Sequence, residues 1–254
     1  MLTGIAGAIG VSLAGCTTGA DGGTGASSTT TTTSDDTTTE ATATQTSAVA
    51  PADDDGTASF DEERLQDRLD EYPTNDLTDA EISGLKFMRE EEKLAHDLYT
   101  ELGKYSDYPA FKNIADLEET HTEPVAALLE KYDLEDPVTD EPGQFANEEL
   151  QSLYDSLLEK GQGSPEAALR VGAEVEEVDI VDIQERADAT DEAAITLVYE
   201  DLVRGSRNHL RAFVSVLENQ LGASYEPQHL SQDTFREIVE SGMETGGAGG
   251  QDGQ

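Results

Sequence analysis

The chain has 254 residues, and its 55 Asp and Glu outnumber its 15 Lys and Arg, which gives a formal net charge of -40 at pH 7. Because the negative charge is spread along the chain, it disfavours binding to nucleic acid, whose phosphates would repel it. Self-repulsion on this scale destabilises a folded protein at low ionic strength, whereas about 1 M salt shortens the Debye length to about 3 Å. The composition therefore predicts a halophilic protein, with a merely acidic mesophilic protein as the alternative.

The first 16 residues are predicted to form a lipoprotein-type signal segment. An apolar, glycine-rich stretch ends in Leu13-Ala14-Gly15-Cys16, which is similar to a lipobox, and Cys16 is the only cysteine of the chain. A lipidated Cys16 would anchor the protein to the outer face of the cytoplasmic membrane. No Lys or Arg precedes the apolar stretch, although export signals carry one. Two alternatives therefore stay open: a native start upstream of Met1, or a small buried helix with an incidental cysteine.

Composition divides the remaining residues into three parts. Residues 17–59 are rich in Thr, Ser and Gly and contain almost no large apolar side chains, so they are predicted to be a disordered acidic stalk. Residues 60–242 have the apolar content of a single folded domain. Residues 243–254 are predicted to be a disordered, Gly-rich tail.

Apolar residues at helical spacing predict a short helical segment, four long helices and one additional helix within residues 60–242. Gly161 is expected to stop the additional helix, and Ser164 is expected to cap the helix that follows it. No segment alternates like a β-strand, so the fold class is predicted to be all-α. The order of the helices is that of a ferritin-like four-helix bundle with a long crossover containing an extra helix. The predicted ranges are 61–71, 78–103, 109–132, 147–160, a helix starting at 165, and 191–221.

Several charged residues fall inside the apolar stripes of the four long helices when each helix is laid out at about 100° per residue. Such residues are informative, because Asp, Glu and Lys are rarely buried without a partner. Glu91 lies near the middle of its stripe and Glu92 at the edge, so Glu92 is the alternative to Glu91. The residues expected to face outward are Glu90, Glu119, Glu123, Glu174 and Glu177. The predicted inward set is Glu91, Glu118, His121, Glu176, Asp179 and His209.

The predicted inward set contains four carboxylates and two imidazoles, which is the inventory with which a helical bundle holds two iron or manganese ions. Glu118 and His121 lie three residues apart, so their side chains are neighbours that can bind the same metal ion. A single Glu-x-x-His is a weak signal in an acidic chain, but ligand types on four helices are a stronger one. A metal-free polar network is the alternative, with His209 as a satisfied core histidine and the carboxylates paired to Arg or Tyr. Lys93 and Arg211 are the obvious basic candidates, but neither shares the apolar stripe.

Four stretches of the chain resemble the DUF2202 family, a domain of unknown function that is assigned to the ferritin-like superfamily. The resemblance implies a ferritin-like fold and, with the lipobox and the acidic composition, a haloarchaeal lipoprotein-type member; it implies no established activity. Ser206 stands where a ferritin or rubrerythrin has the Glu of a second Glu-x-x-His. Three consequences stay open: Asp179 replaces that carboxylate, only a single metal ion binds, or the site has decayed. The stretches are Phe87–Ala95, Ile114–His121, Val171–Ile180 and Gly205–Phe213.

The first functional hypothesis is a membrane-anchored protein with a dinuclear iron or manganese site that reacts with oxygen or peroxide, in the manner of rubrerythrins. The chain has no Cys-x-x-Cys module, so a peroxidase would need a separate electron donor. The second hypothesis is metal capture or sensing without turnover. The third is a metal-free helical interaction module at the cell surface.

Overall fold

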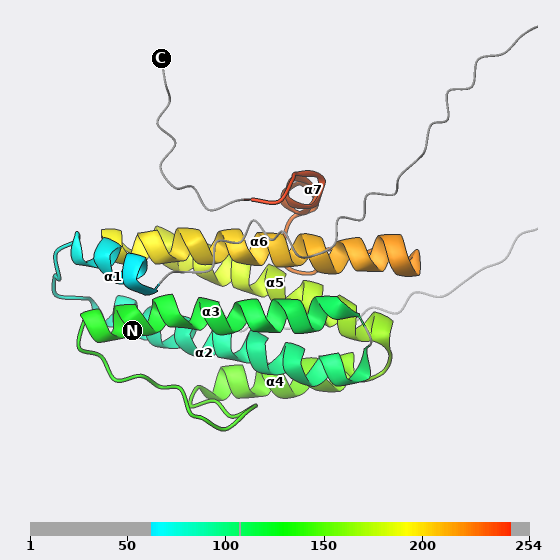
Figure 1. Ribbon diagram of the computed structural model, residues 1–254, viewed down its shortest axis with the longest axis horizontal. Coiled ribbons are helices and arrows are strands. Elements are labelled where there is room, and N and C mark those ends of the chain that lie inside the picture. The colour runs from blue at the N-terminus through cyan, green and yellow to red at the C-terminus, as the bar shows by residue number, and fades with distance from the viewer. Residues whose placement is uncertain (1–61, 107, 245–254) are drawn as a thin grey trace, which may run out of the picture. The chain divides into compact units, whose positions relative to one another are not determined.

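The computed structural model describes residues 62–106 and 108–244, which all belong to one compact unit (Figure 1). Every regular element in these residues is helical, so the predicted all-α class is confirmed. The predicted signal segment, with Cys16, the predicted stalk and residues 245–254 of the predicted tail lie outside the described residues. Among the described helices, none has an apolar stretch long enough to cross a membrane. The helices are α1 (Glu62–Asp70), α2 (Asp79–Leu102), η1 (Gly103–Tyr105), α3 (Pro109–Lys131), α4 (Glu148–Gly161), α5 (Pro165–Asp188), α6 (Ala193–Leu221) and α7 (Gln232–Glu240).

The helix starts follow from local hydrogen bonding. At the start of α2, the Thr78 hydroxyl accepts from the N–H of Glu81 at 3.2 Å, and the Glu81 carboxylate accepts from the N–H of Thr78 at 2.8 Å. At α5, Ser164 accepts from the N–H of Ala167 at 3.1 Å, which confirms the predicted cap. Helix α6 begins two residues later than predicted, because Glu192 keeps an extended backbone with φ -80° and ψ 110°.

Four long helices form a bundle in which α2 packs along α3 and α5 packs along α6 (Figure 1). The two pairs meet through contacts of α3 with α6 and of α2 with α5, so each long helix has two long neighbours. Helix α4 lies against α2 and α5, and α1 lies against α3. The four long helices therefore enclose a common interior.

Two glycines mark places where neighbouring helices come very close. A Cβ atom on Gly172 of α5 would lie 2.7 Å from the ring of Phe213 on α6. A Cβ atom on Gly161 would lie 2.6 Å from Leu102, and Gly161 is the last residue of α4 rather than the residue that stops it. Glycine is therefore needed at position 161 for close packing and not for a helix cap.

Two residues expected to face outward are instead buried, and both hold segments that cover the bundle. Glu90 is 4% exposed and accepts hydrogen bonds from the N–H groups of Ala146 and Asn147 in the connection before α4. Glu177 is fully buried and accepts from the Tyr225 hydroxyl at 2.7 Å. It also accepts from three consecutive backbone N–H groups at residues 228–230. The outward prediction was wrong for both because each helix has a second packed face.

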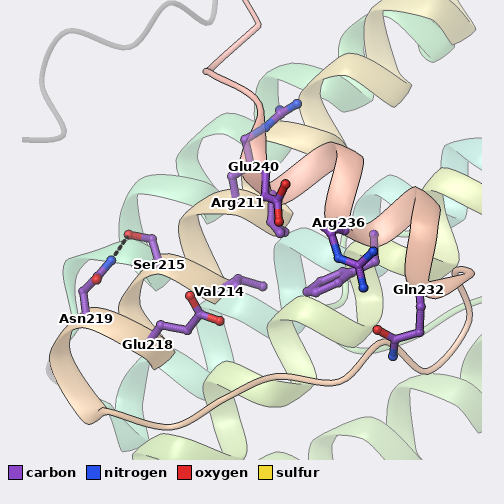
Figure 2. A pocket seen from close by; sticks show the side chains of 10 residues that line it. Arg211, Val214, Ser215, Glu218, Asn219, Gln232, Arg236 and Glu240 are labelled. Atoms are coloured by element: carbon purple, nitrogen blue, oxygen red, sulfur yellow. Dashed lines mark hydrogen bonds between the residues drawn. The ribbon is translucent and has the colours of Figure 1, made fainter.

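The segment after α6 contains α7, a helix that the periodicity had not identified. Its cap Ser231 accepts from the N–H of Thr234, and Phe235 and Ile238 are buried. Arg211 of α6 ties the segment down by donating to the Ile238 carbonyl at 2.8 Å. A hollow of about 400 Å³ is lined by residues of α6 and α7, and polar side chains of both helices face it (Figure 2).

Replacing Gly172 by alanine tests the close approach of α5 and α6. The added methyl group would overlap the Phe213 ring, so we expect Gly172→Ala to lower the free energy of unfolding by about 1–3 kcal/mol. The measurement is denaturant unfolding at constant high salt. Gly163→Ala is the matched control, because a Cβ atom there has no neighbour within 4 Å. Equal stability of the two variants would contradict the close contact.

Candidate metal centre

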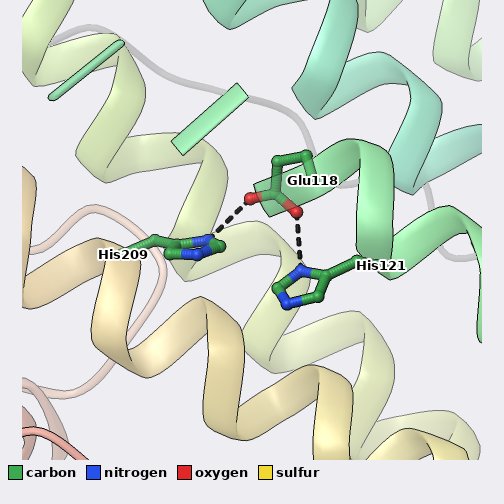
Figure 3. Close-up of side chains that lie close together, drawn as sticks. All are labelled: Glu118, His121 and His209. Atoms are coloured by element: carbon green, nitrogen blue, oxygen red, sulfur yellow. Dashed lines mark hydrogen bonds and ion pairs between the residues drawn. The ribbon is translucent and has the colours of Figure 1, made fainter. Parts of the chain in front are cut away.

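A buried cluster of one glutamate and two histidines lies in the interior of the bundle, and its geometry could hold a metal ion (Figure 3). Glu118 and His121 come from α3, and His209 comes from α6. Nδ1 of His121 lies 2.8 Å from Oε2 of Glu118, and Nδ1 of His209 lies 2.6 Å from Oε1. The Glu118 carboxylate thus lies between the two imidazoles, whose rings stack with centroids 5.1 Å apart.

Two further glutamates extend the cluster to the other pair of helices. Oε2 of Glu92 on α2 lies 3.8 Å from Nδ1 of His121. Oε2 of Glu176 on α5 lies 3.6 Å from Nδ1 of His209. All four long helices therefore contribute a side chain, and each of these side chains is at most 5% exposed.

Glu91 and Glu92 are both buried, so Glu92 does not lie at the edge of the packed face as expected. Glu92 is the one next to His121, whereas Glu91 lies beside Asp182 of α5. Asp179 is 1% exposed and is close enough to Glu91 for the two charges to interact strongly. The structure therefore buries all six predicted residues and places Glu91 and Asp179 next to the Glu–His cluster.

Most of these buried carboxylates lack a hydrogen-bond donor. Among the described residues, neither oxygen of Glu91 nor of Asp179 has a hydrogen-bond partner. The same is true of one oxygen each of Glu92, Glu118 and Glu176, and of both ring nitrogens of His209. Unsatisfied buried polar atoms are rare in folded proteins and costly, because the lost contact with water is not replaced. A concentration of them in one place indicates that something else compensates their charge.

Burial and mutual repulsion shift the pKa values of the cluster. Burial raises the pKa of Asp179, Glu91 and Glu92, and neighbouring carboxylates raise it further. Burial also raises the pKa of Glu176, from an ordinary value of 4.5 to about 7. Glu118 behaves differently: burial alone would raise its pKa, but attraction to His209 and His121 holds the pKa well below the usual range.

The pKa of His209 shows the reverse balance. Burial lowers it, but attraction to Glu118 and Glu176 outweighs burial and raises the pKa of the imidazole. Without a metal ion, protons shared among these groups must limit the negative charge. The two buried basic residues Lys93 and Arg211 do not neutralise the cluster: Lys93 pairs with Asp97, and Arg211 binds the segment around α7.

Three features of the site were not predicted. The Tyr99 hydroxyl donates to Oε1 of Glu176 at 2.6 Å, so one carboxylate does have a tyrosine partner. A Cβ atom on Gly205 of α6 would lie 2.4 Å from Cε1 of His121, so glycine makes room for that imidazole. A glycine inside a helix costs about 1 kcal/mol, and this cost is the signal that could have identified Gly205. Asp182, beside Glu91, was also missed.

Ser206 is buried at the position where a second Glu-x-x-His would place its glutamate. Its hydroxyl donates to the Leu202 carbonyl of its own helix at 3.2 Å. Helix α6 thus contributes His209 alone to the cluster, while α5 contributes Glu176 and Asp179. The distribution of carboxylates among the four helices is therefore asymmetric.

Comparisons with known proteins agree with the resemblance found in the sequence. Residues 81–242 match the DUF2202 family, described as an uncharacterized protein domain. The uncharacterized protein MJ0754 of Methanocaldococcus jannaschii is 45% identical over 179 residues, which cover 70% of this chain and 96% of that protein. The crystal structure of hypothetical protein MJ0754 from Methanococcus jannaschii matches with a TM-score of 0.66 and 46% identity, over 68% of this chain and 98% of that one.

The shifted pKa values predict how the metal-free protein responds to pH. Carboxyls with a higher pKa in the folded than in the unfolded chain bind protons more tightly when folded, so raising the pH above about 4.5 lowers the free energy of unfolding. Each excess proton contributes a slope of about 1.4 kcal/mol per pH unit. We expect the double variant Glu91→Gln, Asp179→Asn to show a shallower decline in the free energy of unfolding. The measurement is denaturant unfolding in chelator and high salt, between about pH 5 and about pH 8.

The matched control is Glu119→Gln with Glu123→Gln, which removes two carboxylates that are exposed on α3, as predicted. This control should keep the parental slope. An equal flattening in both double variants would assign the pH dependence to the overall charge of the protein and not to the buried cluster.

Proposed function

The chain belongs to the DUF2202 family, and we propose that its helical domain is a ferritin-like four-helix bundle that binds two iron or manganese ions in its interior. One observation carries the proposal: carboxylates and imidazoles from all four long helices converge in the interior, and several of their atoms have no partner among the described residues. A metal-free network would be expected to satisfy its own hydrogen bonds, because half-satisfied buried networks are destabilising.

The donor set fits iron or manganese. Carboxylate oxygens and imidazole nitrogens suit these metals, whereas soft thiolate ligands are missing from the cluster. Five carboxylates meet here, and two divalent cations would offset most of their charge. Metal binding would thus replace the protons that otherwise limit repulsion.

Each residue of the cluster would have a distinct part in holding the ions. Glu118 lies between the two imidazoles and would be a central oxygen ligand of the site. Glu92, beside His121, and Glu176, beside His209, would supply further oxygen ligands, and the two histidines would supply nitrogen ligands. Glu91 and Asp179 would supply further oxygen ligands. This assignment makes Glu92, and not Glu91, the ligand of α2 that lies beside a histidine.

The chemistry proposed for the site is a reaction with oxygen or peroxide, for which the two bound ions would supply the redox capacity. Tyr99 orients Glu176 because its hydroxyl donates a hydrogen bond to Oε1. The rings of Tyr99, Phe111 and Phe213 pack together with centroid distances of 5.2–6.3 Å and exclude water from this end of the cluster. Electrons would come from a separate donor protein.

The proposed location is the outer face of the cytoplasmic membrane. It rests on the sequence around Cys16, which would carry the lipid, and on residues 17–59, which would act as a stalk. High salt in that compartment would screen the repulsion within a chain of net charge -40.

Metal capture or sensing without turnover is the second candidate. The observation that favours it is the depth of the cluster, because Glu118, His121 and His209 are at most 5% exposed and a substrate would need a route to them. A metal-free interaction module is the remaining alternative.

Metal analysis of the full-length chain tests the proposal. Purified in high salt without chelator or histidine tag, the chain should carry about two iron or manganese ions. Metal at about 100 times its Kd should raise the free energy of unfolding by about 2.7 kcal/mol. Glu118→Gln with His121→Gln should lose both effects, whereas Glu119→Gln with Glu123→Gln should keep them. A parent without metal, even after anaerobic reconstitution, would overturn the proposal and leave the interaction module.

Peroxide consumption separates the redox protein from the metal-binding one. With a chemical reductant supplied in place of the donor protein, the metal-loaded chain should consume hydrogen peroxide, and the Glu118→Gln, His121→Gln variant should not. Stoichiometric metal without any consumption above that of free metal ions would favour capture or sensing.

A further inference from the structure

A row of mostly polar residues, called the file below, leads from the buried cluster to one end of the bundle. Its members are Glu91, Asp179, Asp182, Arg186, Gly84 and Glu81. On α5, Asp179, Asp182 and Arg186 follow one another at spacings of three and four residues, so they lie on one face of the helix. On α2, Glu91 and Gly84 are seven residues apart and also share a face. Exposure is greater away from the interior: Glu91 is 1% exposed, whereas the side chains of Asp182 and Arg186 are 26% and 23% exposed.

A small cavity of about 40 Å³ lies at the outer part of this file, among residues of α2, α5 and α6. It has room for at least one water molecule. A Cβ atom on Gly84 would lie 3.6 Å from Cδ of Arg186 and 3.7 Å from the Tyr199 hydroxyl oxygen, so a larger side chain would fill the space. Glu81 also lines the cavity and accepts from the Thr190 hydroxyl at 2.7 Å, which places a carboxylate at its outer side.

Arg186 is the positive group nearest to the unsatisfied end of the cluster. Its guanidinium lies 3.4 Å from the Asp182 carboxylate and stacks over the Phe87 ring at 4.0 Å. It also donates to the Asp182 carbonyl at 2.9 Å. Asp182 in turn lies beside Glu91, which has no hydrogen-bond donor of its own among the described residues. Arg186 therefore offsets negative charge between the cavity and the interior.

The opposite end of the cluster offers cations a poorer route. Tyr99 and Phe111 are fully buried there and fill the interior between the cluster and the surface. A hollow of about 450 Å³ lies outside them, but Lys104 and Lys112 line it and are paired with neighbouring carboxylates. Glu91 and Asp179, whose two oxygens both lack a hydrogen-bond partner among the described residues, lie at the Arg186 end.

We infer that the file from Glu81 past Gly84 and Arg186 to Asp182 and Glu91 is the path by which divalent cations reach the buried cluster. Arg186 holds the path closed in the metal-free protein by pairing with Asp182. An arriving cation replaces the guanidinium beside Asp182 and passes to Glu91 and Asp179, whose free oxygens draw it inward. This inference rests on the proposed metal site, and it assigns to Asp182 and Arg186 a role in uptake and not in permanent ligation.

The rate of manganese uptake tests the path. Metal-free full-length chain is mixed with Mn²⁺ in high salt, and the loss of the electron paramagnetic resonance signal of aqueous Mn²⁺ is followed with time. Gly84→Leu should fill the cavity and slow uptake by about tenfold or more, the size of effect that a guided route has on association. Arg186→Gln should speed uptake, because the path loses its closing group. Gly84→Ala is the matched control and should load at the parental rate, since its methyl group fits. Final manganese per chain should be equal in all four proteins.

The outcomes distinguish the path from the site. Equal final manganese with an unchanged rate in Gly84→Leu would overturn the path and leave the metal site standing. A parent that binds no Mn²⁺ would overturn the proposed site, and the path with it. If circular dichroism shows that Gly84→Leu does not fold, Arg186→Gln decides alone, and a parental or slower rate in that variant overturns the inference.

Discussion

The burial of five carboxylates with too little positive charge around them is the constraint on which the rest of the structure depends. Two like charges about 4 Å apart repel each other by about 4 kcal/mol at an effective dielectric constant of about 20. Glu91, Glu92, Glu118, Glu176 and Asp179 are each at most 1% exposed. In the described part of the chain, the basic side chains beside them are His121, His209 and Arg186. Because full ionisation would be so costly, the interior must hold protons or cations, and the packing around it keeps water from taking their place.

Residues next to the cluster along the chain hold the segments that cover the bundle. Glu90 precedes Glu91 and binds the connection before α4, and Glu177 follows Glu176 and binds residues 225–230. Asn208 precedes His209 and donates to the Glu244 carbonyl at 2.9 Å. Successive residues on a helix point about 100° apart, so anchoring one of them outside fixes the rotation of the helix and thereby the direction of its neighbour inside. The covering segments thus help to position α2, α5 and α6 around the cluster.

Helical periodicity was sufficient to predict the long helices and the six buried residues, because an intruding charge within an apolar stripe faces the interior whatever lies opposite. It was wrong about Glu90 and Glu177, since it assumes that each helix has one packed face and cannot anticipate the segments that cover the other. It could not separate Glu91 from Glu92, because both are buried and only the position of His121 on α3 distinguishes them. The contact of Gly205 with His121 also depends on how the helices meet, whereas the pairing of Asp182 with Arg186 lies within α5, at a spacing of four residues. The ferritin-like assignment, the metal and the lipid anchor stay predictions.

The asymmetry of the ligands gives the site a direction. Ser206 leaves α6 with a histidine alone, and Asp179 adds a second carboxylate to α5. The α2 and α5 side of the cluster therefore carries more carboxylates than the α3 and α6 side. The imidazoles lie on the α3 and α6 side, where the Glu118 carboxylate lies 2.8 Å from Nδ1 of His121 and 2.6 Å from Nδ1 of His209. Most of the carboxylate oxygens without hydrogen-bond partners lie on the α2 and α5 side, and the file through Asp182 and Arg186 leads to that side. A cation that enters along the file would therefore meet oxygen ligands first and nitrogen ligands last, so the hydrated ion would lose its water to carboxylates before it reached the histidines.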